Sequence, residues 1–341
     1  MRLFKGLYLE VTRKCNLRCL HCYNESGNEF EMPLEKIIEL LDNAYSLNNK
    51  FSLAISGGEF FKHSHFNEII EYCINKQIDT TIVTNGTLIK SDFVNNIAKF
   101  ENIKFQISID GIGDVNDLIR GKGTFEKINK TLDLFIEKNL ISKITAHYVI
   151  NNLNYSCIEE TIDYLTKKGV KNLDFNMVVN QGRTLDNCET LVFKDYQSSY
   201  NRIKKEIYDL SLKYPEINIG NIDTTYSCPI FNDNNADLNI KIDTLGNIYL
   251  CQLFNGNSAV VGNIYNNSLE EALYNDNVDI FIQKVIKIFN TNQNCKKCLW
   301  KICCKRGCPA KYFTNLDVDT YYADCEILKN KYKKVLKNEK T

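Results

Sequence analysis

The sequence predicts an α/β fold, in which a partly closed barrel of six strand–helix units precedes a small, cysteine-rich α+β domain. Two observations predict this arrangement. Over the first two thirds of the chain, six runs rich in β-branched and aromatic residues alternate with helical patterns. Beyond them the alternation stops and cysteines gather. We therefore expect domains at residues 1–220 and 221–341, with the boundary known to about ten residues.

The individual elements follow from local patterns. The expected strands are residues 7–12, 51–56, 79–84, 104–109, 144–150 and 173–178. The expected helices of the barrel part are residues 33–48, 66–76, 91–100, 124–138, 156–168 and about 193–214. Two Ser-x-x-Glu patterns, Ser156 with Glu159 and Ser268 with Glu271, predict helix starts with reciprocal side-chain caps. Residues 238–244 and 248–253 flank Leu245-Gly246-Asn247 and predict a hairpin.

Composition excludes several classes of function. Lys plus Arg and Asp plus Glu both number 42, so no net charge attracts nucleic acid or a membrane surface. The N-terminus lacks the apolar stretch of a signal peptide, and no run of about 18 apolar residues occurs, which predicts a cytoplasmic protein. Fourteen cysteines in such a reducing compartment indicate metal binding or catalysis rather than disulfides.

Three cysteines follow the first expected strand directly: Cys15, Cys19 and Cys22. A [4Fe–4S] cluster needs one ligand per iron, and proteins usually supply four cysteines. A three-cysteine loop therefore leaves one iron open to a substrate group. A structural zinc loop is the alternative, but zinc usually takes four ligands in pairs, and the triplet has no nearby fourth.

This loop resembles that of the radical S-adenosylmethionine (SAM) superfamily, and further motifs match in order along the chain. They are Ser56-Gly57-Gly58-Glu59, Thr84-Asn85-Gly86, Ser108-Ile109-Asp110-Gly111 and Arg120. The resemblance implies that Cys15, Cys19 and Cys22 are catalytic cluster ligands. It also implies a SAM site built from Gly57, Gly58, Glu59, Asn85, Ser108, Asp110 and Arg120. Each motif ends an expected strand, where α/β barrels build active sites.

The C-terminal cysteines resemble the SPASM extension of radical SAM enzymes, which holds two auxiliary [4Fe–4S] clusters. If the ligand positions of that family are transferred to this sequence, the ligands of the outer cluster are Cys295, Cys298, Cys304 and Cys325. Those of the inner cluster are Cys228, Cys251 and Cys308. The fourth inner ligand is missing. An open iron, an oxygen ligand from Asp233 or Asp237, or a shift of Cys303 would complete the set. Two zinc sites are the alternative, since Cys-x2-Cys pairs often bind zinc.

The resemblance implies SAM and three [4Fe–4S] clusters as cofactors. It also implies an oxidoreductase that makes a 5′-deoxyadenosyl radical to modify a peptide or protein. The leading hypothesis is maturation of a ribosomally made peptide by oxidative thioether or C–C cross-linking. Alternatives are peptide epimerisation, with Cys188 as hydrogen donor, and sulfatase-type formylglycine formation. The second is disfavoured because Gln252 stands where those enzymes carry an aspartate base. An iron–sulfur electron carrier is the non-enzyme alternative, although a carrier needs no SAM site.

The expected partners are the peptide and a reductant such as flavodoxin or ferredoxin. The chain starts a few residues before its first strand, so we expect peptide recognition to fall to a separate protein or to the barrel and SPASM surfaces.

Overall fold

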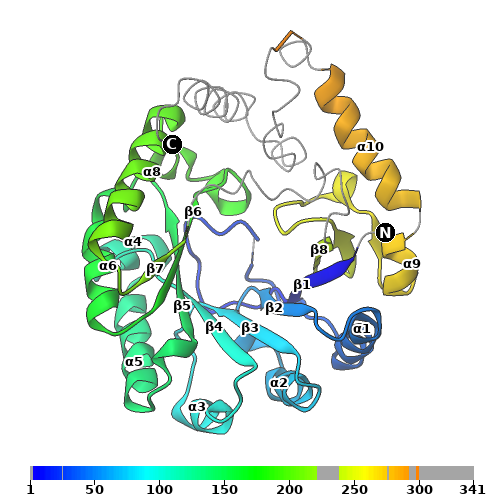
Figure 1. Cartoon of the computed structure of the whole chain (residues 1–341), viewed down its shortest axis with the longest axis horizontal. Coiled ribbons are helices and arrows are strands. Elements are labelled where there is room, and N and C mark those ends of the chain that lie inside the picture. Colours follow the sequence, from blue (N-terminus) through cyan, green and yellow to red (C-terminus); the bar gives the residue numbers. More distant parts are fainter. Residues whose placement is uncertain (1–2, 25, 221–237, 275, 292–296, 299–341) are drawn as a thin grey trace.

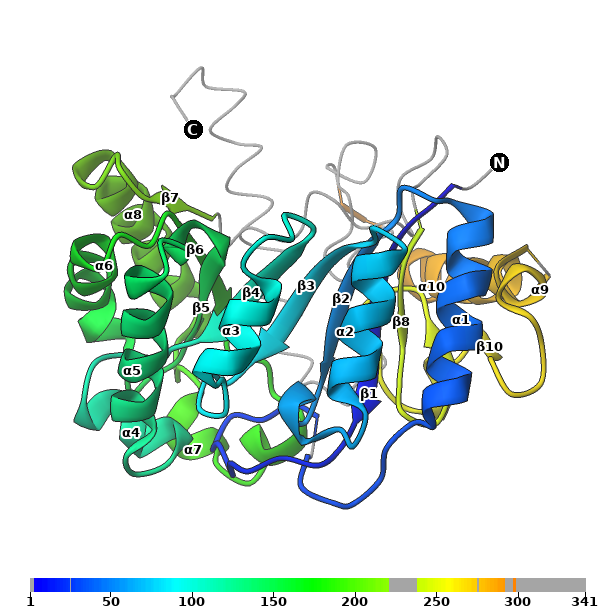
Figure 2. The same cartoon turned by 90° about the horizontal axis from the view of Figure 1, so that it is seen from below.

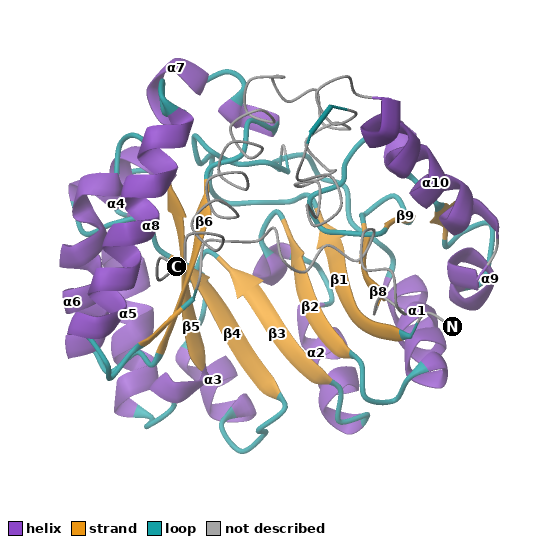
Figure 3. Cartoon of the chain, turned by 45° about the horizontal axis from the view of Figure 1, so that its top comes forward, coloured by secondary structure: helices purple, strands orange, loops and turns teal. Residues whose placement is uncertain are grey.

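The computed structural model describes residues 3–24, 26–220, 238–274, 276–291 and 297–298. Within them a single curved sheet of ten strands runs in the order β10-β9-β8-β1-β2-β3-β4-β5-β6-β7. All neighbours from β8 through β1 to β7 are parallel, and the strands β8, β9 and β10 pair antiparallel. Figure 3 shows the strands fanned into an open, barrel-like sheet. The expected partial α/β barrel is confirmed.

The strands of the sheet are β1 (Phe4–Thr12), β2 (Ser52–Gly57), β3 (Asp79–Thr84), β4 (Ile103–Ser108), β5 (Ile144–Ile150), β6 (Asn172–Met177), β7 (Asn218–Ile219), β8 (Leu238–Ile242), β9 (Asn247–Tyr249) and β10 (Gly262–Asn263). The α-helices are α1 (Leu34–Leu47), α2 (Phe66–Asn75), α3 (Ser91–Ile97), α4 (Asp114–Arg120), α5 (Thr124–Glu137), α6 (Ile158–Lys167), α7 (Cys188–Leu191), α8 (Tyr196–Lys213), α9 (Leu269–Tyr274) and α10 (Asp276–Thr291). Short 3-10 turns include η3 (Tyr155–Cys157) and η4 (Gly182–Thr184).

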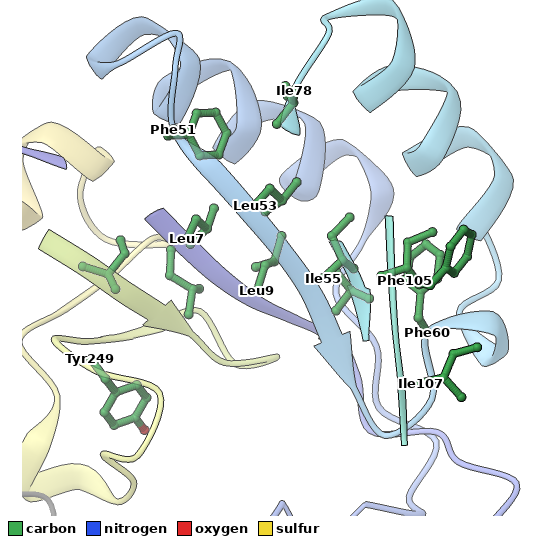
Figure 4. Close-up of a cluster of buried hydrophobic side chains, with 14 of the residues drawn as sticks. Leu7, Leu9, Phe51, Leu53, Ile55, Phe60, Ile78, Phe105, Ile107 and Tyr249 are labelled. Atoms are coloured by element: carbon green, nitrogen blue, oxygen red, sulfur yellow. The ribbon is translucent and has the colours of Figure 1, made fainter. Parts of the chain in front are cut away.

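The helices cover one face of the sheet, as Figures 1 and 2 show for α1, α2, α3 and α5. Apolar residues at every second strand position join them in one buried core, because successive side chains of a strand point to opposite faces. Figure 4 shows part of this apolar layer, including Leu7, Leu9, Leu53, Ile55 and Phe105. The residues between them face the inside of the barrel, and there the strands are polar.

The expected hairpin is present, but it does not form a sheet of its own. Its first strand, β8, lies parallel to β1, with Leu238 opposite Phe4 and Ile242 opposite Leu9. The hairpin therefore extends the barrel sheet beyond β1. The segment that joins α8 and β7 to this hairpin, residues 221–237, lies outside the described residues.

One expected cap forms and the other does not. At α9 the Ser268 Oγ accepts the Glu271 N–H at 3.2 Å, while the Ser268 N–H donates to the Glu271 carboxylate at 3.0 Å. The cap expected at Ser156 is wrong, because the turn η3 precedes α6 and Cys157 takes the cap position without a side-chain bond. Glu159 instead accepts a hydrogen bond from Lys213 of α8.

No helix of the described residues is long and apolar enough to cross a bilayer.

Candidate cofactor and iron–sulfur site

The three-cysteine loop leaves the end of β1 at the mouth of the barrel. Cys19 is buried, whereas Cys15 and Cys22 are half-buried. The Leu17 N–H donates to the Cys15 sulfur at 3.4 Å, and the Cys22 sulfur lies 3.3 Å from the Ser26 hydroxyl. Burial raises the pKa of the Cys15 thiol and raises that of Cys19 to about 11. Binding to iron would overcome this cost, because a coordinated thiol is deprotonated.

The loop carries three thiols, one for each of three irons of a cluster. Among the described residues, no three His, Cys, Asp or Glu side chains gather as closely as the ligands of a single metal ion. A [4Fe–4S] cluster takes one cysteine per iron, so its sulfur ligands bind separate metal atoms. The charges of Cys15 and Cys22 nevertheless act on the pKa of Cys19, which places the three sulfurs in one neighbourhood.

The glycine pair after β2 packs its backbone against this loop. The Gly58 N–H donates to the Thr12 carbonyl at 2.6 Å, and the Glu59 N–H donates to the Lys14 carbonyl at 2.9 Å. A Cβ at Gly57, which has φ +139°, would lie 2.2 Å from the Thr12 oxygen, and one at Gly58 would lie 2.4 Å from the Lys14 oxygen. Only glycine permits this approach of the two loops.

Glu59 ties the ends of β2 and β3 together. Its carboxylate accepts hydrogen bonds from the Thr84 hydroxyl at 2.8 Å, the Asn85 N–H at 2.7 Å and the Phe61 N–H at 3.2 Å. Burial raises the pKa of this carboxyl despite those donors. Asn85 in turn donates its side-chain amide to Asn16 of the cysteine loop at 3.0 Å. That Glu59 and Asn85 contact SAM stays a prediction.

Asp110, after β4, is the centre of a buried charged group. Its Oδ2 lies 2.7 Å from the Arg120 Nε and 2.5 Å from the His21 Nε2, and its Oδ1 accepts the Val149 N–H at 2.8 Å. Burial alone would raise the pKa of Asp110, but the Arg120 and His21 side chains hold it well below its usual value. The group joins the cysteine loop at His21 to the end of α4.

Arg120 thus lies in an ion pair with Asp110, and its carbonyl contacts the Cys19 sulfur at 3.9 Å. Ser108 ends β4 half-buried beside this group. The expected contacts of Ser108 and Arg120 with the SAM carboxylate stay predictions. Six of the seven expected SAM-site residues lie at the carboxyl ends of β2, β3 and β4, and the seventh, Arg120, ends α4.

Below the loop, the inside of the barrel holds a second polar group on β1 and β8. The Tyr8 hydroxyl donates to Ser56 at 2.7 Å and lies 3.0 Å from the Tyr23 hydroxyl. Two positions along, Glu10 is 2% exposed, and its Oε1 has no hydrogen-bond partner among the described residues. Burial raises the pKa of Glu10, and the charge of Lys241 and the nearby Asn24 side chain oppose that rise.

Lys241 lies on β8 directly opposite Tyr8 in the sheet register and is 1% exposed. Its ammonium donates to the Asn255 side chain and sits 4.5 Å from the centre of the Tyr249 ring. Burial lowers the pKa of Lys241, while the charges of Glu10 and of Cys251 raise it. We call Tyr8, Glu10 and Lys241 the lumen group; it joins β1, which leads to the cysteine loop, to β8, the first strand of the hairpin that precedes Cys251.

Comparison with known proteins gives two domain matches. Residues 9–165 match the model of the radical SAM superfamily, and residues 228–299 match SPASM, described as an iron–sulfur cluster-binding domain. The chain is a radical SAM protein with a SPASM domain. Radical SAM domains use SAM with a [4Fe–4S] cluster, and SPASM domains bind auxiliary clusters, so these are its cofactors. The three thiols at Cys15, Cys19 and Cys22 fit the first of them.

Among curated relatives, an uncharacterised protein of Methanocaldococcus jannaschii is 32% identical over 51% of this chain and 63% of its own length. The subtilosin biosynthesis protein AlbA of Bacillus subtilis is 30% identical over 52% of this chain and 40% of its own length. The mycofactocin maturase MftC of Mycolicibacterium smegmatis is 32% identical over 36% and 32%. The matches thus span about a third to less than two thirds of those proteins.

Solved structures share the fold. SuiB of Streptococcus suis bound to SAM superposes with a TM-score of 0.72 at 20% identity, covering 91% of this chain and 74% of that one. The structure of anSMEcpe with SAM and a peptide bound superposes with a TM-score of 0.70 at 20% identity. The match covers 98% of this chain and 99% of that one.

The auxiliary ligands fall only partly within the described residues of the radical SAM chain. Cys251 follows β9 and Cys298 lies near the end of the described part, both half-buried. Gln252 beside Cys251 is exposed. The other expected ligands and candidates lie outside the described residues: Cys228, Asp233, Asp237, Cys295, Cys303, Cys304, Cys308 and Cys325. Their assignment to two clusters stays a prediction.

Sequence reasoning missed the lumen group, although a signal was present. Polar residues recur at every second position of strands that the pattern marks as buried, as Tyr8 and Glu10 do in β1 and His147 does in β5. Alternation in a strand covered by helices indicates a polar interior. Burial lowers the pKa of His147 to about 4, so this imidazole is neutral, and Asn176 lies 2.7 Å from it. The next residue of β5, Tyr148, packs in the core.

Proposed function

We propose that this radical SAM protein cleaves SAM reductively to a 5′-deoxyadenosyl radical and uses it to modify a ribosomally made peptide by oxidative thioether or C–C cross-linking. The observation that carries the proposal is the lumen group, a buried polar interior on β1, which leads to the cysteine loop, and on β8, which begins the hairpin before Cys251. A cross-linking enzyme needs a radical source, a site for the reacting side chain and an electron acceptor, and these two strands connect the segments proposed for them.

Relatives support the substrate class. AlbA is named for subtilosin biosynthesis, SkfB of Bacillus subtilis for maturation of the sporulation killing factor, and MftC as a mycofactocin maturase. One SuiB structure contains the precursor peptide SuiA. Since the matches with the curated relatives cover only part of those proteins, the peptide substrate and its recognition are proposed for this chain and not transferred with the fold.

The side chains of the chain divide the work. Cys15, Cys19 and Cys22 would hold the cluster that supplies the electron for SAM cleavage. Gly57 and Gly58 let the end of β2 pack directly against the backbone that leads into the cysteine loop. The apolar layer under the helices and the buried lumen exclude water from the radical.

Glu10 is the proposed proton acceptor. Oxidative cross-linking removes one hydrogen atom from a carbon, which ends on 5′-deoxyadenosine, and then one proton from the attacking thiol or C–H group. The remaining electron goes to an auxiliary cluster as the new bond forms. Glu10 suits the proton because its Oε1 is buried and is not hydrogen-bonded to any described residue, and because burial raises the pKa of this carboxyl.

We further propose three [4Fe–4S] clusters, one at the cysteine loop and two at the SPASM cysteines, a flavodoxin or ferredoxin as reductant, and a cytoplasmic location. Peptide recognition falls to the barrel and SPASM surfaces or to a separate protein.

Mass spectrometry tests the function. The peptide encoded beside the gene would be co-expressed anaerobically with the enzyme, and each cross-link should lower its mass by two hydrogens. A variant with Ala at Cys15, Cys19 and Cys22 should leave the mass unchanged and release no 5′-deoxyadenosine under dithionite. Cys157→Ala is the matched control, since this half-buried cysteine lies away from the loop at the start of α6 and should preserve the modification. An unmodified peptide with active 5′-deoxyadenosine release would reject cross-linking of that substrate.

A further inference from the structure

The loop after β6 meets the cysteine loop through its backbone. Gly182, the first residue of η4, has φ +53°, and a Cβ there would lie 2.4 Å from the Cys22 carbonyl oxygen and 2.7 Å from that of Tyr23. The next N–H, of Arg183, donates to the Cys22 carbonyl at 2.9 Å. A glycine is therefore required where the two loops touch.

The Arg183 side chain continues this contact along the cysteine loop. Its Nε donates to the Cys19 carbonyl at 3.0 Å, and its Nη1 donates to the Ser26 carbonyl at 2.8 Å. One planar guanidinium thus joins Cys19, in the middle of the loop, to Ser26, where the chain leaves it. The rigid fork of the guanidinium allows both hydrogen bonds at once. Its Nη2 is buried and has no hydrogen-bond partner.

Asn187 completes the attachment one turn later. Its side-chain amide donates to the Leu20 carbonyl at 3.3 Å and to the Arg183 carbonyl at 2.8 Å. The segment 182–187 thereby occupies the carbonyls of Cys19, Leu20, Cys22 and Ser26.

The cysteine loop has little internal support to replace these bonds. The loop belongs to no helix or strand. Within residues 15–24 its backbone makes one backbone–backbone hydrogen bond, from the Cys22 N–H to the Cys19 carbonyl at 3.3 Å. Its Leu20 N–H donates outward, to Ile119 of α4. The spacing of the three sulfurs therefore depends on the surrounding segments, of which 182–187 supplies the most donors with Arg183 at its centre.

We infer that Arg183 is a positioning residue of the SAM cluster. Its two carbonyl bonds keep Cys19 and the loop exit at a cluster-binding spacing, and its positive charge favours the reduced, more negative cluster. Charge, hydrogen bonding and solvent exposure set the potential of an iron–sulfur cluster, so a cation next to its ligand loop should raise that potential. The inference rests on the proposed cluster at Cys15, Cys19 and Cys22.

Two variants separate the role of the Arg183 hydrogen bonds from the role of its positive charge. Arg183→Lys keeps the charge but loses the fork, and Arg183→Gln loses the charge. Arg18→Gln is the matched control, because Arg18 also donates to Ser26, at 3.0 Å, and to Gly27, but makes no bond to the Cys19 carbonyl. Circular dichroism and the thermal midpoint establish that each variant folds.

The first readout is hydrogen exchange in the metal-free protein. Peptides covering residues 15–27 should exchange about tenfold faster in both Arg183 variants than in wild type, and less than threefold faster in Arg18→Gln. This readout needs no cluster. Unchanged exchange in the Arg183 variants overturns the holding role, whether or not the cluster forms.

The second readout is the electron paramagnetic resonance signal of the reduced full-length protein, recognised as the SAM cluster by its change when SAM is added. At a fixed solution potential, the ratio of reduced to oxidised cluster should be about tenfold lower in Arg183→Gln than in wild type. For a one-electron couple this corresponds to a reduction potential lower by ~59 mV. Arg183→Lys should reduce like wild type but lose iron to a chelator several-fold faster. An unchanged ratio in Arg183→Gln would overturn the role of the Arg183 charge. A wild type without any SAM-sensitive signal would instead reject the proposed function.

Discussion

The buried acidic residues at the rim of the barrel and those inside it differ in how fully their carboxylate oxygens are paired. Glu59 and Asp110, at the rim, accept hydrogen bonds or ion pairs on both carboxylate oxygens. Glu10, deeper in the barrel, keeps one oxygen without a hydrogen-bond partner among the described residues. An unsatisfied buried polar atom costs about 1–3 kcal/mol, so leaving one is not neutral. The described residues thus satisfy both oxygens of the rim acids, whereas one oxygen of Glu10 is left to accept a further hydrogen bond or a proton.

The largest expected effect concerns the lumen. Glu10→Gln should lower the rate of peptide modification by about 10²–10⁴, the usual contribution of general base catalysis. 5′-Deoxyadenosine release should continue, because SAM cleavage does not use Glu10. Liquid chromatography of both products from one reaction measures the ratio, with Glu270→Gln on exposed α9 surface as the control. Equal loss of both products would mean that Glu10 supports the fold or SAM binding and not proton transfer.

The same variant has a pH signature in the metal-free protein. Burial raises the folded-state pKa of Glu10, so the folded protein holds this proton more tightly than the unfolded chain. Its contribution to stability is complete below the unfolded pKa and is lost as pH rises through the folded pKa. Urea unfolding of Glu10→Gln should therefore lose stability less steeply than wild type over that window. Parallel pH profiles would contradict a buried, raised Glu10.

At the rim, Asp110→Asn should destabilise the metal-free protein by about 3–5 kcal/mol, because it leaves Arg120 buried without its counter-charge. Urea unfolding measures the loss. Asp79→Asn, which breaks an exposed pair with Lys104, should cost about 0–1 kcal/mol. Similar losses for the two would mean that the Asp110 group is as weakly coupled as a surface pair.

Glu59→Gln should cost about 1–3 kcal/mol, since an amide group replaces one acceptor oxygen and faces the Thr84 or Asn85 donors. The exposed Glu68→Gln serves as the control and should unfold at the same urea concentration as wild type. A neutral Glu59→Gln would show that the β2 and β3 loops are held without this carboxylate.

The smallest effect compares a cap that forms with one that does not. Ser268→Ala should cost about 1 kcal/mol by removing the acceptor of the Glu271 N–H. Ser156→Ala should change stability by less than about 0.5 kcal/mol, because Ser156 caps no helix. Thermal unfolding of the two variants decides, and a reversed order would contradict the helix starts described above.

The fold could be predicted from the sequence because each strand and helix follows from a short-range pattern of residues. The six barrel strands lie within a residue or two of their expected bounds, except that β1 starts at Phe4 rather than residue 7, and the cysteine loop follows β1 as expected. Ser156 failed because the competing turn depends on Asn151 and Asn154, whose carbonyls accept the Tyr155 and Cys157 N–H groups. Short-range patterns cannot register such competition.

The site was only partly accessible for a related reason. Motif residues such as Gly57 were found by resemblance, but the partner of each charge is set across long stretches of chain. Arg183 reaches the Cys19 carbonyl over 164 residues, and Lys241 meets β1 only because β8 joins the barrel sheet. No spacing rule gives either contact.

That last pairing has a mechanical consequence. A separate domain carrying Cys251 could rock against the barrel, and the gap for electron tunnelling would fluctuate with it. Here β8 is hydrogen-bonded along β1, from Phe4 opposite Leu238 to Leu9 opposite Ile242, and β1 runs directly into the loop of Cys15. The hairpin and the cysteine loop are therefore joined through one hydrogen-bonded pair of strands, β8 and β1. If a cluster binds at Cys251, the register of this strand pair would help to set its distance from a cluster held at Cys15.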